Sequence, residues 1–170
     1  KHLKNNVVKK VGMPVRKEIE EAGQRSRASA PSSEFHLLVF GGSQGARGVN
    51  TAMVEAMRLD GEWKRGLKVV HQTGPVDFAR ISSEYQKHQI PDVEVLEYLH
   101  DMPARYAWAD LIICRAGTGT ISELAATGSA AILIPFPFAS DNHQQQNAEA
   151  MVQRSAAIMI LQSELSPAGL

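Results

Sequence analysis

Short apolar runs alternate with amphipathic segments along most of the chain. The runs are rich in Val, Ile, Leu and Phe and end at Gly, Pro or polar turns, which is typical of buried strands. They cover residues 35–40, 67–72, 93–98, 111–114, 130–134 and 156–161. Helical patterns lie between them at residues 46–58, 76–88, 103–108, 120–127 and 143–154. Buried strands that alternate with helices predict an α/β fold, a doubly wound parallel sheet of about six strands with helices on both faces.

The segment before the first predicted strand follows a different pattern. Residues 5–22 predict a short strand, a Gly-Pro turn and a helix, which would suit a link to a neighbouring domain. Residues 22–34 lack apolar periodicity and predict a flexible loop. The chain starts at Lys1 without a methionine and ends in SPAGL, which resembles the opening of another helix. We therefore expect a piece of a longer protein.

Charge and composition narrow the choice of partners. Lys plus Arg and Asp plus Glu number 18 each, so the formal net charge is zero, which argues against nucleic acid or an anionic membrane as the main partner. The single cysteine, Cys114, excludes an internal disulfide and suits a reducing cytoplasm. These 170 residues show no basic-then-apolar pattern of the kind found in leaders, and the longest apolar run, residues 130–139, contains two prolines and is too short to span a bilayer. The sequence predicts a soluble cytoplasmic protein.

A glycine-rich turn, GGSQGARGVN at residues 41–50, follows the first predicted strand. Ligands of open α/β sheets bind at the carboxyl ends of strands, and glycines permit a tight turn and close approach of a ligand. The candidate ligand is an anion such as phosphate. The turn has neither the Gly-Lys-Ser/Thr of a Walker A loop nor GxGxxG spacing, so ATP and NAD are not favoured. A plain strand-to-helix turn is the alternative.

A second loop, CRAGTGTISELAATG at residues 114–128, follows the fourth predicted strand. Thr120 and Glu123 have the spacing of a capping box, in which Glu123 would bond to the backbone at the start of its own helix. The alternative is functional, because a carboxylate near the strand ends can accept two hydrogen bonds from the vicinal diol of a ribose.

Two further loops give weaker signals. Asp141 and Gln144 again have capping-box spacing, and one glutamine at this first turn would point across the same crevice as Glu123. Leu99 and Met102, at the end of the third predicted strand, are ordinary apolar residues whose simplest role is packing. The helix after Gln144 is predicted to bury one apolar stripe, formed by Ala148, Met151 and Val152.

Several ordered motifs together resemble the C-terminal domain of the MurG family of glycosyltransferases. The motifs are GMPVR at 12–16, GGSQGARGVN at 41–50, HQTG at 71–74, DMPARYAWADLIICRAG at 101–117, TISELAATG at 120–128 and DNHQQQNA at 141–148. The family transfers N-acetylglucosamine from its UDP conjugate to a lipid-linked muramyl-pentapeptide, converting lipid I to lipid II in peptidoglycan synthesis. The resemblance implies one Rossmann-like half of a two-domain GT-B enzyme. Residues 1–15 would then be an interdomain linker and the end of an absent N-terminal domain, and residues 16–170 a UDP-sugar-binding domain, incomplete at its C-terminal end.

The resemblance also implies a set of donor contacts. Arg16 and Ser43 would lie on the diphosphate side, Gln44 would be a further substrate contact on the glycine turn, and Gln144 would reach the sugar hydroxyls. The remaining contacts are Leu99 and Met102 beside the uracil, the backbone of Thr118, Gly119, Thr120 and Ile121 along the nucleoside, and Glu123 on the ribose. Ser122, next to Glu123, would be a further substrate contact. Two departures from the family pattern could change the local shape, namely Met13, where Asn is common, and the Thr-Gly-Thr stretch at 118–120.

The implied chemistry needs no metal or other cofactor. Helix N-termini can stabilise the departing diphosphate, and the chain contains no Asp-x-Asp pair. The resemblance assigns the catalytic base, the lipid acceptor and contact with the cytoplasmic face of the membrane to the absent half, so this chain alone should not catalyse transfer. Two alternatives stay open: a related GT-B enzyme acting on a glycolipid or natural product, and a non-catalytic nucleotide-sugar-binding module. Five histidines, His36, His71, His88, His100 and His143, are weaker candidates for a base.

Overall fold

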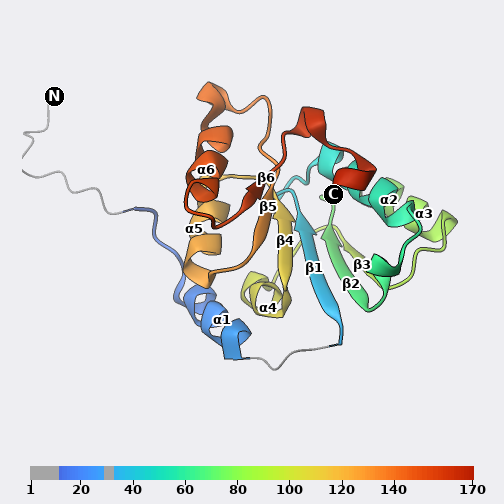
Figure 1. The fold of residues 1–170 in the computed structure, drawn as a ribbon, viewed down its shortest axis with the longest axis horizontal. Coiled ribbons are helices and arrows are strands. Elements are labelled where there is room, and N and C mark those ends of the chain that lie inside the picture. The colour runs from blue at the N-terminus through green and yellow to red at the C-terminus, as the bar shows by residue number, and fades with distance from the viewer. Residues whose placement is uncertain (1–11, 29–32) are drawn as a thin grey trace, which may run out of the picture.

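The computed structural model describes residues 12–28 and 33–170, which form a parallel six-stranded sheet with helices on both faces (Figure 1). The strand order is β3-β2-β1-β4-β5-β6. The strands are β1 (Phe35–Phe40), β2 (Leu67–Gln72), β3 (Val93–Leu96), β4 (Leu111–Cys114), β5 (Ala131–Leu133) and β6 (Ile158–Met159). This is the order of dinucleotide-binding Rossmann sheets, in which the chain reverses its direction of winding between β1 and β4.

The helices divide between the two faces of the sheet. They are α1 (Lys17–Ala28), α2 (Arg47–Arg58), α3 (Phe78–Lys87), α4 (Met102–Trp108), α5 (Thr118–Thr127) and α6 (His143–Val152). Helices α1, α4, α5 and α6 contribute to one hydrophobic cluster and α2 and α3 to the other. The C-terminal segment, with short turns of 3-10 helix at Gln162–Glu164 and Pro167–Gly169, runs to the α2 side (Figure 1).

Strand β1 shows why both faces need a cover. Leu38 and Phe40 point into the cluster with α4 and α5, whereas Leu37 and Val39 point into the cluster with α2 and α3. All four are buried, because side chains alternate across a strand and a parallel sheet is covered on both sides. Burying each such side chain contributes roughly 1.5–3 kcal/mol.

The strand and helix pattern predicted from the sequence is confirmed, with small differences at the ends of elements. Strands β1, β2 and β4 have the predicted bounds, while β3, β5 and β6 are shorter than the apolar runs that contain them. Pairing limits these three strands: β3 has four register partners on β2, β5 has three on β4, and the edge strand β6 has two on β5. The apolar residues outside the ladders continue into loops. The short strand expected between residues 5 and 11 lies outside the described residues.

The loop predicted for residues 22–34 is wrong in its first part. Helix α1 continues to Ala28, because Ile19 and Ala22 are fully buried against the cluster that includes α4 and α5. Packing of this narrow stripe outweighs the weak apolar periodicity of the sequence that follows it.

Both predicted capping boxes are also wrong. Helix α5 starts earlier than expected, with Gly117 as its N-cap, so Thr120 lies inside the helix and Glu123 is beyond its first turn. Helix α6 has Asn142 as its N-cap, and no side chain caps either helix. The stripe predicted on α6 holds for Ala148 and Met151 but not for Val152, which is exposed.

Candidate functional site

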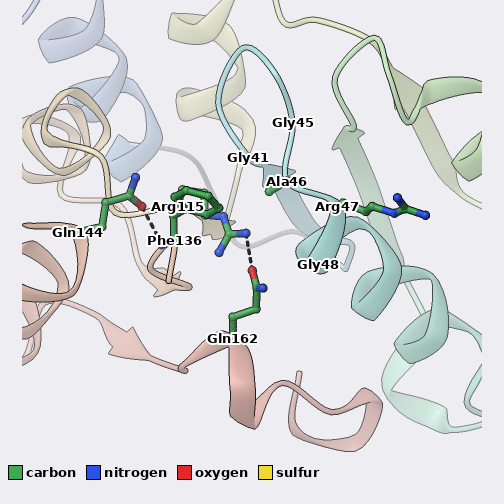
Figure 2. A pocket seen from close by; sticks show the side chains of 9 residues that line it. All are labelled: Gly41, Gly45, Ala46, Arg47, Gly48, Arg115, Phe136, Gln144 and Gln162. Carbon is green, nitrogen blue, oxygen red and sulfur yellow. Dashed lines mark hydrogen bonds between the residues drawn. The ribbon is translucent and has the colours of Figure 1, made fainter. Parts of the chain in front are cut away.

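The reversal between β1 and β4 places a pocket at the carboxyl end of the sheet. The pocket, of about 360 Å³, lies between the glycine turn after β1, the start of α2 and the loops after β4 and β5 (Figure 2). Its lining residues are Gly41, Gly45, Ala46, Arg47, Gly48, Arg115, Phe136, Gln144 and Gln162. Ligands of doubly wound sheets bind at this reversal, so the fold itself marks this pocket as the first candidate site.

The glycine turn packs closely against the loop after β2. Gly45 has φ +76°, and a Cβ atom at this position would lie 1.8 Å from the carbonyl oxygen of Thr73. Gly74 meets the turn from the other side, where a Cβ would lie 2.2 Å from the carbonyl oxygen of Gln44. The two backbones therefore approach each other more closely than side chains would allow. The contact fixes the position of the turn at the entrance to α2.

The first turn of α2 presents backbone N–H groups at this pocket. Ala46 is the N-cap and provides no side-chain hydrogen bond, and Ala46, Arg47 and Gly48 all line the pocket. The first N–H groups of a helix have no partner within the helix and carry partial positive charge, so this end can bind an anion. The side chain of Arg47 points away from Arg115, so Arg47 contributes backbone to the pocket (Figure 2).

Arg115, which directly follows β4, places a buried cation opposite α2. Its Nη1 donates to the carbonyl oxygens of Ile134 (3.1 Å) and Pro135 (3.0 Å), and its Nη2 donates to Oε1 of Gln162 (2.6 Å; Figure 2). The guanidinium carbon lies 5.4 Å from the centre of the Phe136 ring. Burial lowers the pKa of Arg115 to about 10, so the side chain is still charged at neutral pH. Arginine has five N–H donors, and these three bonds leave further donors for a ligand.

Two glutamines complete the wall of the pocket. Gln162 comes from the C-terminal segment and packs against Gly48, where a Cβ would lie 2.9 Å from its Cδ. Gln144, half-buried at the start of α6, accepts a hydrogen bond from the backbone N–H of Phe136 at 3.0 Å through Oε1. Its amide nitrogen takes no part in this bond. Gln144 lines this pocket, whereas Glu123, which was expected across the same crevice, is not among its lining residues.

A buried polar network holds the loop after β2 in place. The Asn50 side chain donates to the carbonyl oxygen of Thr73 and to Asp77 Oδ2, both at 2.9 Å. Its oxygen can only accept, so His71 donates from Nε2 and accepts from the Tyr85 hydroxyl at Nδ1. Burial lowers the pKa of His71 to about 3, so the imidazole is neutral at physiological pH. These contacts give His71 a structural role and make it unsuitable as a base that works near pH 7.

A second, smaller pocket lies on the other side of the glycine turn. It has a volume of about 150 Å³ and brings Ser43 together with Leu99 and Met102. Phe40, Gly42, Gln72 and Tyr98 form the rest of its wall. Leu99 is buried and Met102 packs on the adjoining core, so both residues serve packing and also form an apolar surface at the strand ends. Ser43 lies with these two residues and not in the larger pocket.

Glu123 is held by a residue of the core and not by its own helix. Its Oε2 accepts a hydrogen bond from the Tyr106 hydroxyl at 3.0 Å, and the carboxylate is half-buried. Arg16 is exposed just before α1 and is not part of the wall of the larger pocket. Ser122 donates to the carbonyl oxygen of Thr118 inside α5. Gly119, Thr120 and Ile121 form the rest of the first turns of α5, and Gln44 is exposed on the glycine turn.

Comparison with known proteins assigns the family. The sequence model of the glycosyltransferase family 28 C-terminal domain matches residues 36–170. The chain belongs to glycosyltransferase family 28. Both pockets lie within the matched region.

Individual relatives agree with this assignment. A Bdellovibrio bacteriovorus protein named UDP-N-acetylglucosamine–N-acetylmuramyl-(pentapeptide) pyrophosphoryl-undecaprenol N-acetylglucosamine transferase is 46% identical over 98% of this chain and 45% of its own length. A protein of the same name from Geobacter is 44% identical over 94% of this chain and 43% of its own length. The crystal structure of Acinetobacter baumannii MurG superposes with a TM-score of 0.77 at 32% identity, over 89% of this chain and 43% of that one. The chain thus spans less than half the length of these relatives.

Sequence reasoning missed two residues of the pocket at the sheet reversal, Arg115 and Gln162. Arg115 had a readable signal, because an arginine directly after a buried apolar strand stands at the ligand-binding edge of the sheet. Gln162 had none, since its place depends on how the C-terminal segment returns to the pocket.

Two of the candidate histidines, His36 and His88, form ion pairs away from the pocket at the sheet reversal. His36 is within 3.7 Å of Glu34 and 3.4 Å of Asp110, near the amino ends of the strands. His88 pairs with Glu84 on α3.

In the part of the chain that the structure describes, no helix is both long enough and apolar enough to cross a membrane.

Proposed function

We propose that the chain is the donor-binding half of a transferase that moves N-acetylglucosamine from UDP-N-acetylglucosamine to undecaprenyl-pyrophosphoryl-N-acetylmuramyl-pentapeptide. One observation carries the proposal: the N-terminus of α2 and the buried Arg115 converge on a pocket at the sheet reversal, in a chain 46% identical to a protein with that name. A nucleoside diphosphate sugar has the charge that such a pocket recognises.

The two pockets suggest how the donor lies. The apolar surface of Leu99 and Met102 would receive the uracil, and the diphosphate would sit near Arg115 and the uncapped starts of α2 and α5. Gln144 would face the sugar. Ser43, on the turn between the pockets, would bond to the phosphate nearer the nucleoside. Arg16 and Glu123 would approach the nucleotide from the α4 and α5 side.

This arrangement suits the chemistry of transfer. The acceptor oxygen would form a bond to the anomeric carbon while the bond between that carbon and the β-phosphate oxygen breaks, and the electron pair of the broken bond would leave with UDP. Backbone N–H groups and the Arg115 cation would stabilise the negative charge that grows on the β-phosphate, without any rearrangement at the moment of reaction. The acceptor hydroxyl would lose its proton to a base in the part of the relatives that this chain does not span. That part would also bind the lipid-linked acceptor and meet the membrane at its cytoplasmic face.

Selectivity for the sugar tests the proposal. Gln144 can both donate and accept, so it suits two neighbouring sugar hydroxyls, and an inverted hydroxyl would leave one group unpaired at a cost of roughly 1–3 kcal/mol. The chain should therefore bind UDP-N-acetylglucosamine more tightly than UDP-N-acetylgalactosamine in competition calorimetry. Replacing Gln144 by Ala should narrow this preference and leave UDP affinity nearly unchanged.

The matched control is Gln146→Ala, because Gln146 is exposed on the same helix and bonds to the backbone of Asp141. This variant should keep the sugar preference. If Gln144→Ala lowers the affinity for UDP and for both sugar nucleotides by the same factor, Gln144 only holds the start of α6. Absence of UDP binding by the unmodified chain would contradict the proposed function itself.

A further inference from the structure

The Tyr106–Glu123 pair joins α4, whose Tyr106 lies in the hydrophobic core, to Glu123 of α5. Tyr106 is fully buried in α4, and its ring packs edge to face against Phe40 of β1 with centres 6.4 Å apart. Its hydroxyl donates to Oε2 of Glu123 across the space between α4 and α5. The tyrosine ring is thus fixed by the core, while its polar end holds a carboxylate that is half-buried.

The direction of this hydrogen bond is well defined. Burial raises the pKa of Tyr106 far above its usual value, and the neighbouring Glu123 carboxylate raises it further. The phenol therefore stays protonated and can only satisfy the carboxylate as a donor. Among the described residues, the Tyr106 hydroxyl is the one hydrogen-bond donor to the Glu123 side chain, and it engages Oε2. Oε1 keeps its capacity to accept.

A glutamate on a helix surface normally samples several rotamers, which costs free energy when it must hold a ligand in one geometry. A donor anchored in the core removes much of this freedom before the ligand arrives. We propose that Tyr106 is a positioning residue, whose hydroxyl orients Glu123 so that the carboxylate can accept hydrogen bonds from the vicinal diol of the donor's ribose. This inference rests on the proposed function.

The test compares UDP with 2′,3′-dideoxyuridine diphosphate, which lacks the diol. By calorimetry the unmodified chain should bind UDP at least about tenfold more tightly, a difference typical of charge-assisted hydrogen bonds. Tyr106→Phe keeps the ring and removes the hydroxyl. It should weaken UDP binding roughly 3- to 10-fold and leave the affinity for the dideoxy ligand unchanged. In the Glu123→Gln variant, Tyr106→Phe should weaken UDP binding by a smaller factor than it does in the unmodified chain, because both substitutions remove the same interaction.

Tyr85→Phe is the matched control, since Tyr85 is a second buried tyrosine whose hydroxyl bonds to His71. It should leave the ratio of the two affinities unchanged. Equal weakening of both ligands by Tyr106→Phe would show a merely structural role, and no weakening of either would also overturn the inference. Equal affinity of the unmodified chain for both ligands would remove the diol contact on which it depends. Failure of the unmodified chain to bind UDP at all would instead count against the proposed function.

Discussion

Replacing Arg115 by Met should weaken the binding of UDP-N-acetylglucosamine by about 2–4 kcal/mol, roughly 30- to 1000-fold. The guanidinium is held in place by two carbonyl oxygens and by Gln162, so it would meet the diphosphate without reorganising. Methionine keeps much of the side-chain volume and removes the charge. The fold should suffer less than the affinity, because loss of the bonds to the carbonyls is partly offset by removal of a desolvated cation.

Calorimetry with UDP-N-acetylglucosamine and thermal unfolding of the same samples separate these two effects. Arg105→Met is the control, because Arg105 of α4 pairs with Glu94 of β3 at 2.9 Å, and such a partly exposed pair contributes roughly 0–1 kcal/mol. This variant should bind the donor normally. If Arg115→Met binds as tightly as the control, the diphosphate does not lie beside Arg115.

Replacing Gly45 by Ala should lower the free energy of unfolding by about 3–5 kcal/mol and weaken donor binding at least about tenfold. The new methyl group would collide with the carbonyl oxygen of Thr73, which is backbone and cannot move aside like a flexible side chain. The glycine turn would have to separate from the loop after β2. Since this contact positions the start of α2, the N–H groups in the pocket would shift with it.

Gly42→Ala is the control that separates the effect of the collision on stability from the effect of the positive φ. Gly42 also has a positive φ, of +90°, but a Cβ there would meet no atom within 4 Å. Its replacement should cost only the conformational strain, roughly 1–2 kcal/mol. Denaturant unfolding of both variants measures the difference. Equal destabilisation would show that the approach of the two loops contributes nothing beyond backbone strain.

Much of this fold could be predicted from the chain because its strands are buried on both faces. Strands such as Phe35–Phe40 are nearly continuous apolar runs, and their alternation with amphipathic helices leaves few topologies open. The glycine turn was equally readable, since closely spaced glycines after a buried strand predict a tight turn at the ligand-binding edge.

The errors arose where tertiary contacts override local patterns. The Thr120–Glu123 spacing fits a capping box, but Tyr106 of another helix bonds to the Glu123 carboxylate. Gln162 is distant in sequence from Arg115 and reaches it through the return of the C-terminal segment. The sequence around Gln162 contains no pattern that predicts such a contact.

The central claim is that the donor's diphosphate binds at the sheet reversal, and an amide-resolved NMR titration tests it most directly. On addition of UDP-N-acetylglucosamine, the largest shifts should fall on Gly45, Arg47 and Arg115, with smaller shifts near Leu99 and Gln144. Uridine, which lacks the diphosphate, should perturb the surroundings of Leu99 and spare the start of α2. Saturable shifts centred instead on the pocket beside Arg58 and His88, at the opposite end of the strands, or no saturable shifts at all, would contradict the account.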